Sequence, residues 1–195
     1  MDLIAHWDDL VEYYGDEISP YKDRLKVAGY QTHAILTCRW SPTENITFQN
    51  FDGDHAEDQI LADRIWTADV PAALGSWTDQ NPAPMVVTLA INRSPCDRCA
   101  GNLAHALHDL HNRFALRTPK QHFLLAMRGY YESQKFMQNG KYEETTVTTT
   151  GGLKLLKDAG WKLCVLLFDD ESSVLEGNRR KLVRQRGLLQ ALRSL

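Results

Sequence analysis

The sequence lacks several features that would assign it to a specialised class of protein. Only four of its 195 residues are cysteine, too few for the disulfide framework of a small secreted domain. No apolar run approaches the ~20 residues of a membrane-spanning helix, and no basic-then-apolar leader is present. The chain is 43% hydrophobic and 24% charged, which is ordinary for a soluble globular protein. We therefore expect a single domain that acts in the cytoplasm and has no membrane partner.

The chain also lacks a strong excess of one charge, because its formal net charge is only −3. The distribution of charge is less even. From Leu175 onward there are one acidic and six basic residues, a local balance of +5, and the basic residues are Arg179, Arg180, Lys181, Arg184, Arg186 and Arg193. This segment is either the solvated face of a terminal helix or an electrostatic guide for phosphate groups.

Two short motifs indicate a metal site. Residues 55–57 read His-Ala-Glu, and residues 95–99 read Pro-Cys-Asp-Arg-Cys. His55, Cys96 and Cys99 supply three ligands of the kinds that Zn²⁺ prefers, which leaves a fourth position for water. In this interpretation Glu57 is not a ligand but the acid/base group that moves protons during hydrolysis. The signature H-x-E followed by P-C-x-x-C is that of zinc nucleobase deaminases.

Each motif alone has simpler interpretations. A His-x-Glu tripeptide is often a solvated helix end, and a Cys-x-x-Cys pair can be a redox pair or two buried thiols. A closed zinc site with Cys38 or Cys164 as the fourth ligand is a further alternative. Both cysteines lie in apolar runs, which favours small buried thiols instead. Locally, we expect Asp54 to cap the helix that begins at His55, and Ser94 to cap the helix that begins at Pro95.

Hydrophobic periodicity predicts an α/β fold. The predicted strands cover residues 30–40, 46–50, 85–91, 122–128 and 161–168. The predicted helices cover residues 6–14, 55–68, 95–114 and 150–159 and the basic C-terminal segment, with loops at 71–84 and 129–149. A helix joins the last two strands, so these strands should be parallel. We expect a three-layer α/β/α domain with a five-stranded mixed sheet, a core at about residues 30–170, and the N-terminal and C-terminal helices appended to it.

The motifs resemble those of the cytidine deaminase superfamily, and most of all its AID/APOBEC-like branch, including bacterial deaminase toxins. Residues 54–57 (Asp-His-Ala-Glu) and 94–100 (Ser-Pro-Cys-Asp-Arg-Cys-Ala) are similar to its two zinc motifs. Residues 152–160 are similar to its Gly-Leu-x-x-Leu-x-x-Ala-Gly helix. Tyr130 and Tyr131 follow the predicted fourth strand, where these enzymes carry an aromatic substrate loop. The resemblance covers about residues 30–170.

The sequence departs from that branch in two respects. Arg93 stands where enzymes with a Ser-Trp-Ser-Pro-Cys motif have a tryptophan that helps to wall the base pocket. Between Glu57 and Pro95 lie 37 residues, more than is usual in the branch. The loops at 71–84 and 134–149 are long and should border the site, so we expect an unusual substrate preference.

The resemblance implies a zinc-dependent hydrolytic deaminase with one Zn²⁺ per chain. It would convert cytosine to uracil in single-stranded polynucleotide, with DNA favoured over RNA, and we expect Asn50, Ser94, Tyr130 and Tyr131 to contact the substrate. An immunity protein would be a partner if the chain is a toxin domain delivered to a target cell. The alternatives are a tRNA-type adenosine deaminase, a deaminase of free nucleosides or nucleotides, and a catalytically inactive zinc module that binds nucleic acid. The helix between the last two strands argues against the free-nucleoside enzymes, which typically pair those strands antiparallel.

Overall fold

A mixed β-sheet forms the centre of the molecule in the computed structural model. The structure describes residues 3–26, 32–38, 46–50, 54–78, 80–81, 83–114, 120–131, 135–138, 141–144, 148–169, 171–177 and 182–195. Within these residues the sheet has six strands in the order β1-β8-β5-β4-β2-β3. Strands β1, β8, β5 and β4 run parallel to one another, whereas β2 is antiparallel to both β4 and β3. The predicted α/β class and the parallel pairing of the last two predicted strands are therefore confirmed.

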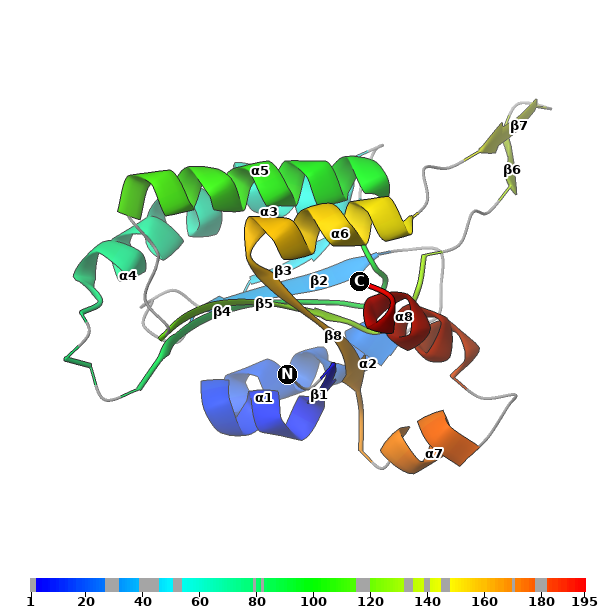
Figure 1. The fold of residues 1–195 in the computed structure, drawn as a ribbon, viewed down its shortest axis with the longest axis horizontal. Coiled ribbons are helices and arrows are strands. Elements are labelled where there is room, and N and C mark those ends of the chain that lie inside the picture. The colour runs from blue at the N-terminus through cyan, green and yellow to red at the C-terminus, as the bar shows by residue number, and fades with distance from the viewer. Residues whose placement is uncertain are drawn as a thin grey trace.

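The strands of this sheet are three to seven residues long. They are β1 (Ile4–His6), β2 (His33–Cys38), β3 (Ile46–Gln49), β4 (Met85–Ile91), β5 (Gln121–Met127) and β8 (Trp161–Leu167). Two further strands, β6 (Lys135–Gln138) and β7 (Lys141–Glu144), pair with each other as a separate antiparallel hairpin. Figure 1 shows this hairpin projecting away from the sheet.

Helices cover both faces of the sheet (Figure 1). On one face lie α3 (Ala56–Ala62), the π-helical turn η2 (Ile65–Asp69), α4 (Val70–Ser76), α5 (Asp97–Phe114) and α6 (Thr150–Ala159). On the other lie α1 (Trp7–Tyr14), the 3₁₀ segment η1 (Asp16–Tyr21) and α2 (Lys22–Lys26). The chain finishes with α7 (Glu171–Gly177) and α8 (Val183–Arg193).

The two faces of the sheet bury separate hydrophobic clusters. Every residue of β4 except the half-buried Val86 is buried, as expected for a strand that is covered on both sides. Alternate residues of β4 belong to different clusters: Leu89 packs under α5 and α6, and Ala90 packs over α1. Helix α5 presents its stripe of Leu103, Leu107 and Leu110 to the first cluster.

Several predicted boundaries are wrong. The sheet has six strands, not five, because Ile4–His6 adds a parallel edge strand beside β8. The predicted loop at 71–84 begins as helix α4, since Pro71 occupies the first turn, where a missing N–H costs nothing. The predicted loop at 129–149 contains the β6–β7 hairpin. The end of the chain has two helices, α7 and α8, and α8 contains Arg184, Arg186 and Arg193, whereas Arg179, Arg180 and Lys181 lie outside the described residues.

The register of the sheet brings one set of loops together at a single edge. Ile91 at the end of β4 is opposite Met127 at the end of β5, and it is also opposite Ala34 near the start of the antiparallel strand β2. The segments that follow β4 and β5 and the segment that precedes β2 therefore meet at this edge. In open α/β sheets, sites form beyond the carboxyl ends of parallel strands.

None of the helices in the described part of the chain combines the length and the apolar character that crossing a bilayer requires.

Candidate functional site

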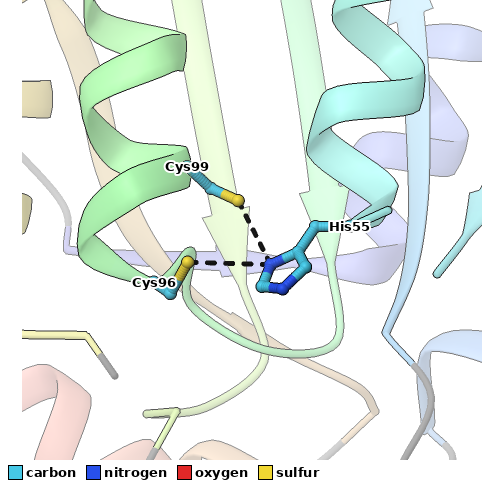
Figure 2. Close-up of side chains that lie close together, drawn as sticks. All are labelled: His55, Cys96 and Cys99. Atoms are coloured by element: carbon cyan, nitrogen blue, oxygen red, sulfur yellow. Dashed lines mark hydrogen bonds between the residues drawn. The ribbon is translucent and has the colours of Figure 1, made fainter. Parts of the chain in front are cut away.

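Three side chains that could hold a metal ion converge at this edge of the sheet. His55 Nδ1 lies 3.2 Å from Cys99 Sγ and 3.6 Å from Cys96 Sγ, and the three candidate ligand atoms lie within 4.8 Å of one another. Figure 2 shows the imidazole pointing from the start of α3 toward both sulfurs at the start of α5. The structure thus brings together the three residues that the sequence motifs predicted.

The spacing and chemistry of these atoms fit a tetrahedral ion. Bonds of about 2.3 Å to sulfur and about 2.0–2.1 Å to nitrogen require sulfur–nitrogen separations of roughly 3.5 Å. The observed 3.2 and 3.6 Å lie on either side of this value. Cys96 and Cys99 are 2% and 0% exposed, and a hydrogen bond to Cys96 together with burial raises the pKa of the Cys99 thiol. Such buried thiols ionise readily only when a cation is bound to them, so the donor set fits a metal.

The two other cysteines do not complete a four-ligand site. Cys164 is buried in the cluster on the α1 face of the sheet, where its thiol donates to the Leu125 carbonyl at 3.7 Å. Cys38 is the last residue of β2 and pairs with Val87. Cys38 follows His33 by five residues, so its backbone is about 16 Å along β2 from the edge of the sheet where the site lies. The side chain of Cys38 lies outside the described residues. A site with three ligands therefore fits better than a closed one.

Glu57 is buried beside the candidate metal ligands. Its side chain is in the first turn of α3 and the residue is only 3% exposed. Burial raises its pKa to about 7. In the described part of the chain, its Oε2 atom has no hydrogen-bond partner. A buried carboxylate oxygen without a partner is costly for folding, which is typical of a group retained for chemistry.

A pocket open to solvent connects Glu57 with the candidate metal site. The residues that line it are Thr32, Asn50, His55, Glu57, Ser94, Cys96 and Tyr131. Three of the four residues predicted to contact the substrate, Asn50, Ser94 and Tyr131, are in this lining. The fourth, Tyr130, is not, because it packs against the large hydrophobic cluster.

Asn50 is held at the rim of the pocket by the backbone of Thr32. The Thr32 N–H donates to Asn50 Oδ1 at 2.7 Å, and the Asn50 N–H donates to the Thr32 carbonyl at 3.2 Å. These contacts orient the Asn50 amide and bring Thr32 into the lining. Sequence reasoning missed Thr32, because only the pairing of β2 with β3 places it here.

Ser94 links the pocket to the loop that follows β5. Its Oγ accepts a hydrogen bond from the Tyr131 N–H at 2.8 Å and lies 2.7 Å from Thr148 Oγ1. The Thr148 hydroxyl in turn donates to the Pro95 carbonyl at 2.6 Å. Thr148 is 3% exposed and lies 54 residues from Ser94 in the sequence, so no local pattern could have identified it.

The expected helix caps are wrong at both motifs. Helix α5 begins at Asp97, and the Ser94 hydroxyl contacts Thr148 instead of capping the helix. Helix α3 has His55 at its N-cap position without a side-chain cap, and Asp54 is exposed. The side chains of His55 and Ser94, which are near these two helix starts, line the pocket instead of capping the helices.

An ion pair fixes α3 against α5 on the outside of the site. Arg98 Nη2 donates to Asp58 Oδ2 at 2.6 Å, and Asn102 Nδ2 donates to Asp58 Oδ1 at 3.1 Å. Asp58 follows Glu57 directly, and Arg98 lies between Cys96 and Cys99. This bridge therefore joins the two segments that carry the candidate ligands.

Comparison with known proteins finds no family model that matches this chain and no similar sequence among the curated proteins. Functional interpretation depends on the site itself.

Proposed function

We propose that the protein is a zinc-dependent hydrolytic deaminase that converts cytosine to uracil in single-stranded polynucleotide, with DNA favoured over RNA. One observation carries the proposal: His55, Cys96 and Cys99 converge at the pocket in which the buried Glu57 carboxyl has an unpartnered oxygen. Three ligands with an acid/base group beside them fit a hydrolytic metal site better than a structural one.

His55, Cys96 and Cys99 would hold one Zn²⁺. When bound, the ion supplies Lewis-acid activation of water. Hydrolytic deamination adds water to C4 of cytosine and releases ammonia, so one group must take protons from water and return them to the base. Glu57 is suited to both steps, because burial raises its pKa to about 7, close to the optimum for acid/base catalysis at neutral pH.

The side chains that line the pocket suit a single base. The Asn50 amide at the rim can hydrogen-bond the base edge, and the Tyr131 ring offers a stacking surface, worth ~1–3 kcal/mol per base. A base in a duplex cannot reach such a pocket unless it is flipped out or already unpaired. The parallel pairing of β5 with β8 supports the resemblance to polynucleotide deaminases over free-nucleoside enzymes.

The test compares three substrates at equal cytosine concentration: free cytidine, a single-stranded oligonucleotide and its matched duplex. The zinc-loaded protein should deaminate the single strand fastest. If free cytidine reacts fastest, the protein is a nucleoside enzyme and the polynucleotide part of the proposal is wrong. If the duplex reacts fastest, the single-strand preference is wrong. If none of the three reacts with zinc-loaded protein, the proposed deamination of cytosine is wrong.

A further inference from the structure

Behind the pocket lies a buried cation for which the proposed chemistry has no use. Arg93 follows β4 and is 5% exposed, and among the described residues its Nη2 atom has no hydrogen-bond partner. Its guanidinium lies over the ring of Tyr131, 5.5 Å from the ring centroid. Tyr131 itself lines the pocket, so one tyrosine separates Arg93 from the candidate active site.

A second arginine approaches the same place from the end of the chain. The Tyr130 N–H donates to the Arg184 carbonyl at 3.2 Å, which docks the first turn of α8 beside the segment after β5. An added Cβ on Gly129 would lie 3.0 Å from the Arg184 Cβ, so glycine permits this close approach. The Ser94 N–H donates to the Gly129 carbonyl at 2.8 Å. Residues 93–94, 129–131 and 184 thus form one cluster.

Among the described residues, no carboxylate forms an ion pair with either arginine of this cluster. Burial and then the nearby Arg184 charge lower the pKa of Arg93. The first turn of α8 contains no acidic residue. Arg128, also at the end of β5, is different, because it donates to both oxygens of Glu171 at 2.5 and 2.8 Å. Buried charges are normally paired in this way.

We propose that Arg93 and Arg184 form a phosphate subsite, which binds the backbone phosphate of a single-stranded polynucleotide whose base enters the pocket beside Tyr131. This proposal rests on the proposed function for the identity of its ligand. Guanidinium groups match the geometry of phosphate oxygens through parallel hydrogen bonds. A phosphate would satisfy the unpartnered N–H of Arg93 and separate two like charges. It would also explain why this position carries arginine beside an aromatic pocket wall.

The experiment measures binding without turnover. A labelled single-stranded DNA oligonucleotide with one cytosine is titrated with the zinc-loaded full chain carrying Glu57→Ala, by fluorescence anisotropy at several salt concentrations. In this background Arg184→Gln should weaken binding between about 10-fold and 100-fold. It should also reduce the slope of log K against log salt by about 0.7, the value for one phosphate contact with a single strand. Arg93→Gln should do the same.

The matched control is Arg193→Gln, which removes one exposed arginine from the last turn of the same helix. It should leave the affinity and the salt slope close to those of the parent. Because Arg93 is buried, thermal unfolding is measured for every variant. Arg184 is only half-buried, so Arg184→Gln decides the question if Arg93→Gln does not fold.

The outcomes separate this subsite from the proposed reaction. If the wild-type chain deaminates the oligonucleotide but Arg184→Gln binds it like the parent, the subsite is wrong and the function stands. If Arg184→Gln loses affinity while the wild-type chain deaminates nothing, the subsite stands and the proposed reaction is wrong. Failure of the parent to bind the oligonucleotide overturns the subsite directly.

Discussion

Cys96 and Cys164 are both buried, each 2% exposed, yet their surroundings differ. Cys96 faces the imidazole of His55, whereas Cys164 faces a backbone carbonyl on the opposite side of the sheet. Burial alone therefore cannot distinguish a metal ligand from a small apolar side chain. What distinguishes them is the convergence of other ligand atoms, so the two residues form a natural pair for mutagenesis.

We predict that Cys96→Ala loses bound zinc and lowers the melting temperature, because metal binding and folding are coupled. Cys164→Ala should keep one zinc per chain, and any loss of stability there should come from lost packing alone. Metal analysis of the purified variants and thermal unfolding make the comparison. Full retention of zinc by Cys96→Ala would remove this residue from the ligand set.

Glu57→Ala should keep zinc and fold but lower kcat by about 10²–10⁴, the usual contribution of an acid/base group. The same substitution removes a buried carboxyl with an unpartnered oxygen, so the melting temperature should stay equal or rise. Kinetics and thermal unfolding are measured on the same preparation. Turnover within about threefold of wild type would mean that another group moves the protons.

At the scale of elements, the packing of α6 on α5 depends on one glycine. A Cβ added to Gly152 would collide with Asp97 Oδ1 and lie 3.3 Å from the Ala100 Cβ. The same Asp97 oxygen accepts hydrogen bonds from the Thr149 N–H at 2.8 Å and from its hydroxyl at 3.0 Å. Thr149 also caps α6. Gly152, the first residue of the Gly-Leu-x-x-Leu-x-x-Ala-Gly segment, thus has a structural role, because its missing side chain lets the start of α6 approach the start of α5.

Gly152→Ala should therefore destabilise the fold by about 1–3 kcal/mol, the usual range for overpacking. Gly101→Ala is the control, because Gly101 lies within α5 and a Cβ there would meet no atom of the described residues within 4 Å. That change should be neutral or stabilise the fold by up to about 1 kcal/mol. Denaturant unfolding measures both. Wild-type stability of Gly152→Ala would contradict this account of the contact.

A second contact between elements makes stability depend on pH. Burial favours the neutral form of Glu171, but its hydrogen bonds to Arg128 and to the Phe168 N–H, together with nearby positive charge, outweigh burial and lower the pKa of Glu171 below its ordinary value of 4.5. Because the folded-state pKa is the lower one, the stabilisation is present above about pH 4.5. It is lost as the pH falls through the folded-state pKa.

Glu171→Gln should therefore cost about 1–3 kcal/mol of unfolding free energy at pH 7, and the difference from wild type should shrink as the pH falls below 4.5. Urea unfolding at a series of pH values from 7 to 3 measures this difference. The control is Glu12→Gln, because Glu12 is exposed and forms no ion pair with any of the described residues. A difference for Glu171→Gln that is independent of pH would show that the ion pair with Arg128 does not stabilise the fold.

Sequence patterns predicted the buried strands β4, β5 and β8 from their short apolar runs, and the helix α5 from its regular apolar stripe. They missed β1, whose three half-buried residues form an edge strand only through pairing with β8. The prolines that suggested a loop at 71–84 include Pro71, which is in the first turn of α4. The hairpin β6–β7 was missed within the polar segment after β5. Short edge strands and proline-initiated helices depend on context that periodicity does not record.

At the scale of the whole molecule, the site is an assembly of distant segments. Metal chemistry restricts ligands to a few residue types at set spacings, so the sequence could predict the candidate ligands His55, Cys96 and Cys99, which the structure brings together. Thr32 lies at the site because of the register between β2 and β3. Thr148 lies there because its hydroxyl is hydrogen-bonded to that of Ser94, 54 residues away in the sequence. The sequence shows Arg93 as a departure from the motif that it otherwise resembles, but the closeness of Arg184 depends on the docking of α8 beside Gly129 and Tyr130.

The measurement that tests the central claim most directly is sequencing of a single-stranded DNA oligonucleotide, containing both cytosine and adenine, after incubation with the zinc-loaded full chain. The account predicts C-to-T changes that accumulate with time and are lost with Glu57→Ala. A-to-G changes alone would show that the protein is an adenine deaminase. The absence of any change with zinc-loaded wild-type protein, or equal C-to-T change with Glu57→Ala, would contradict the account.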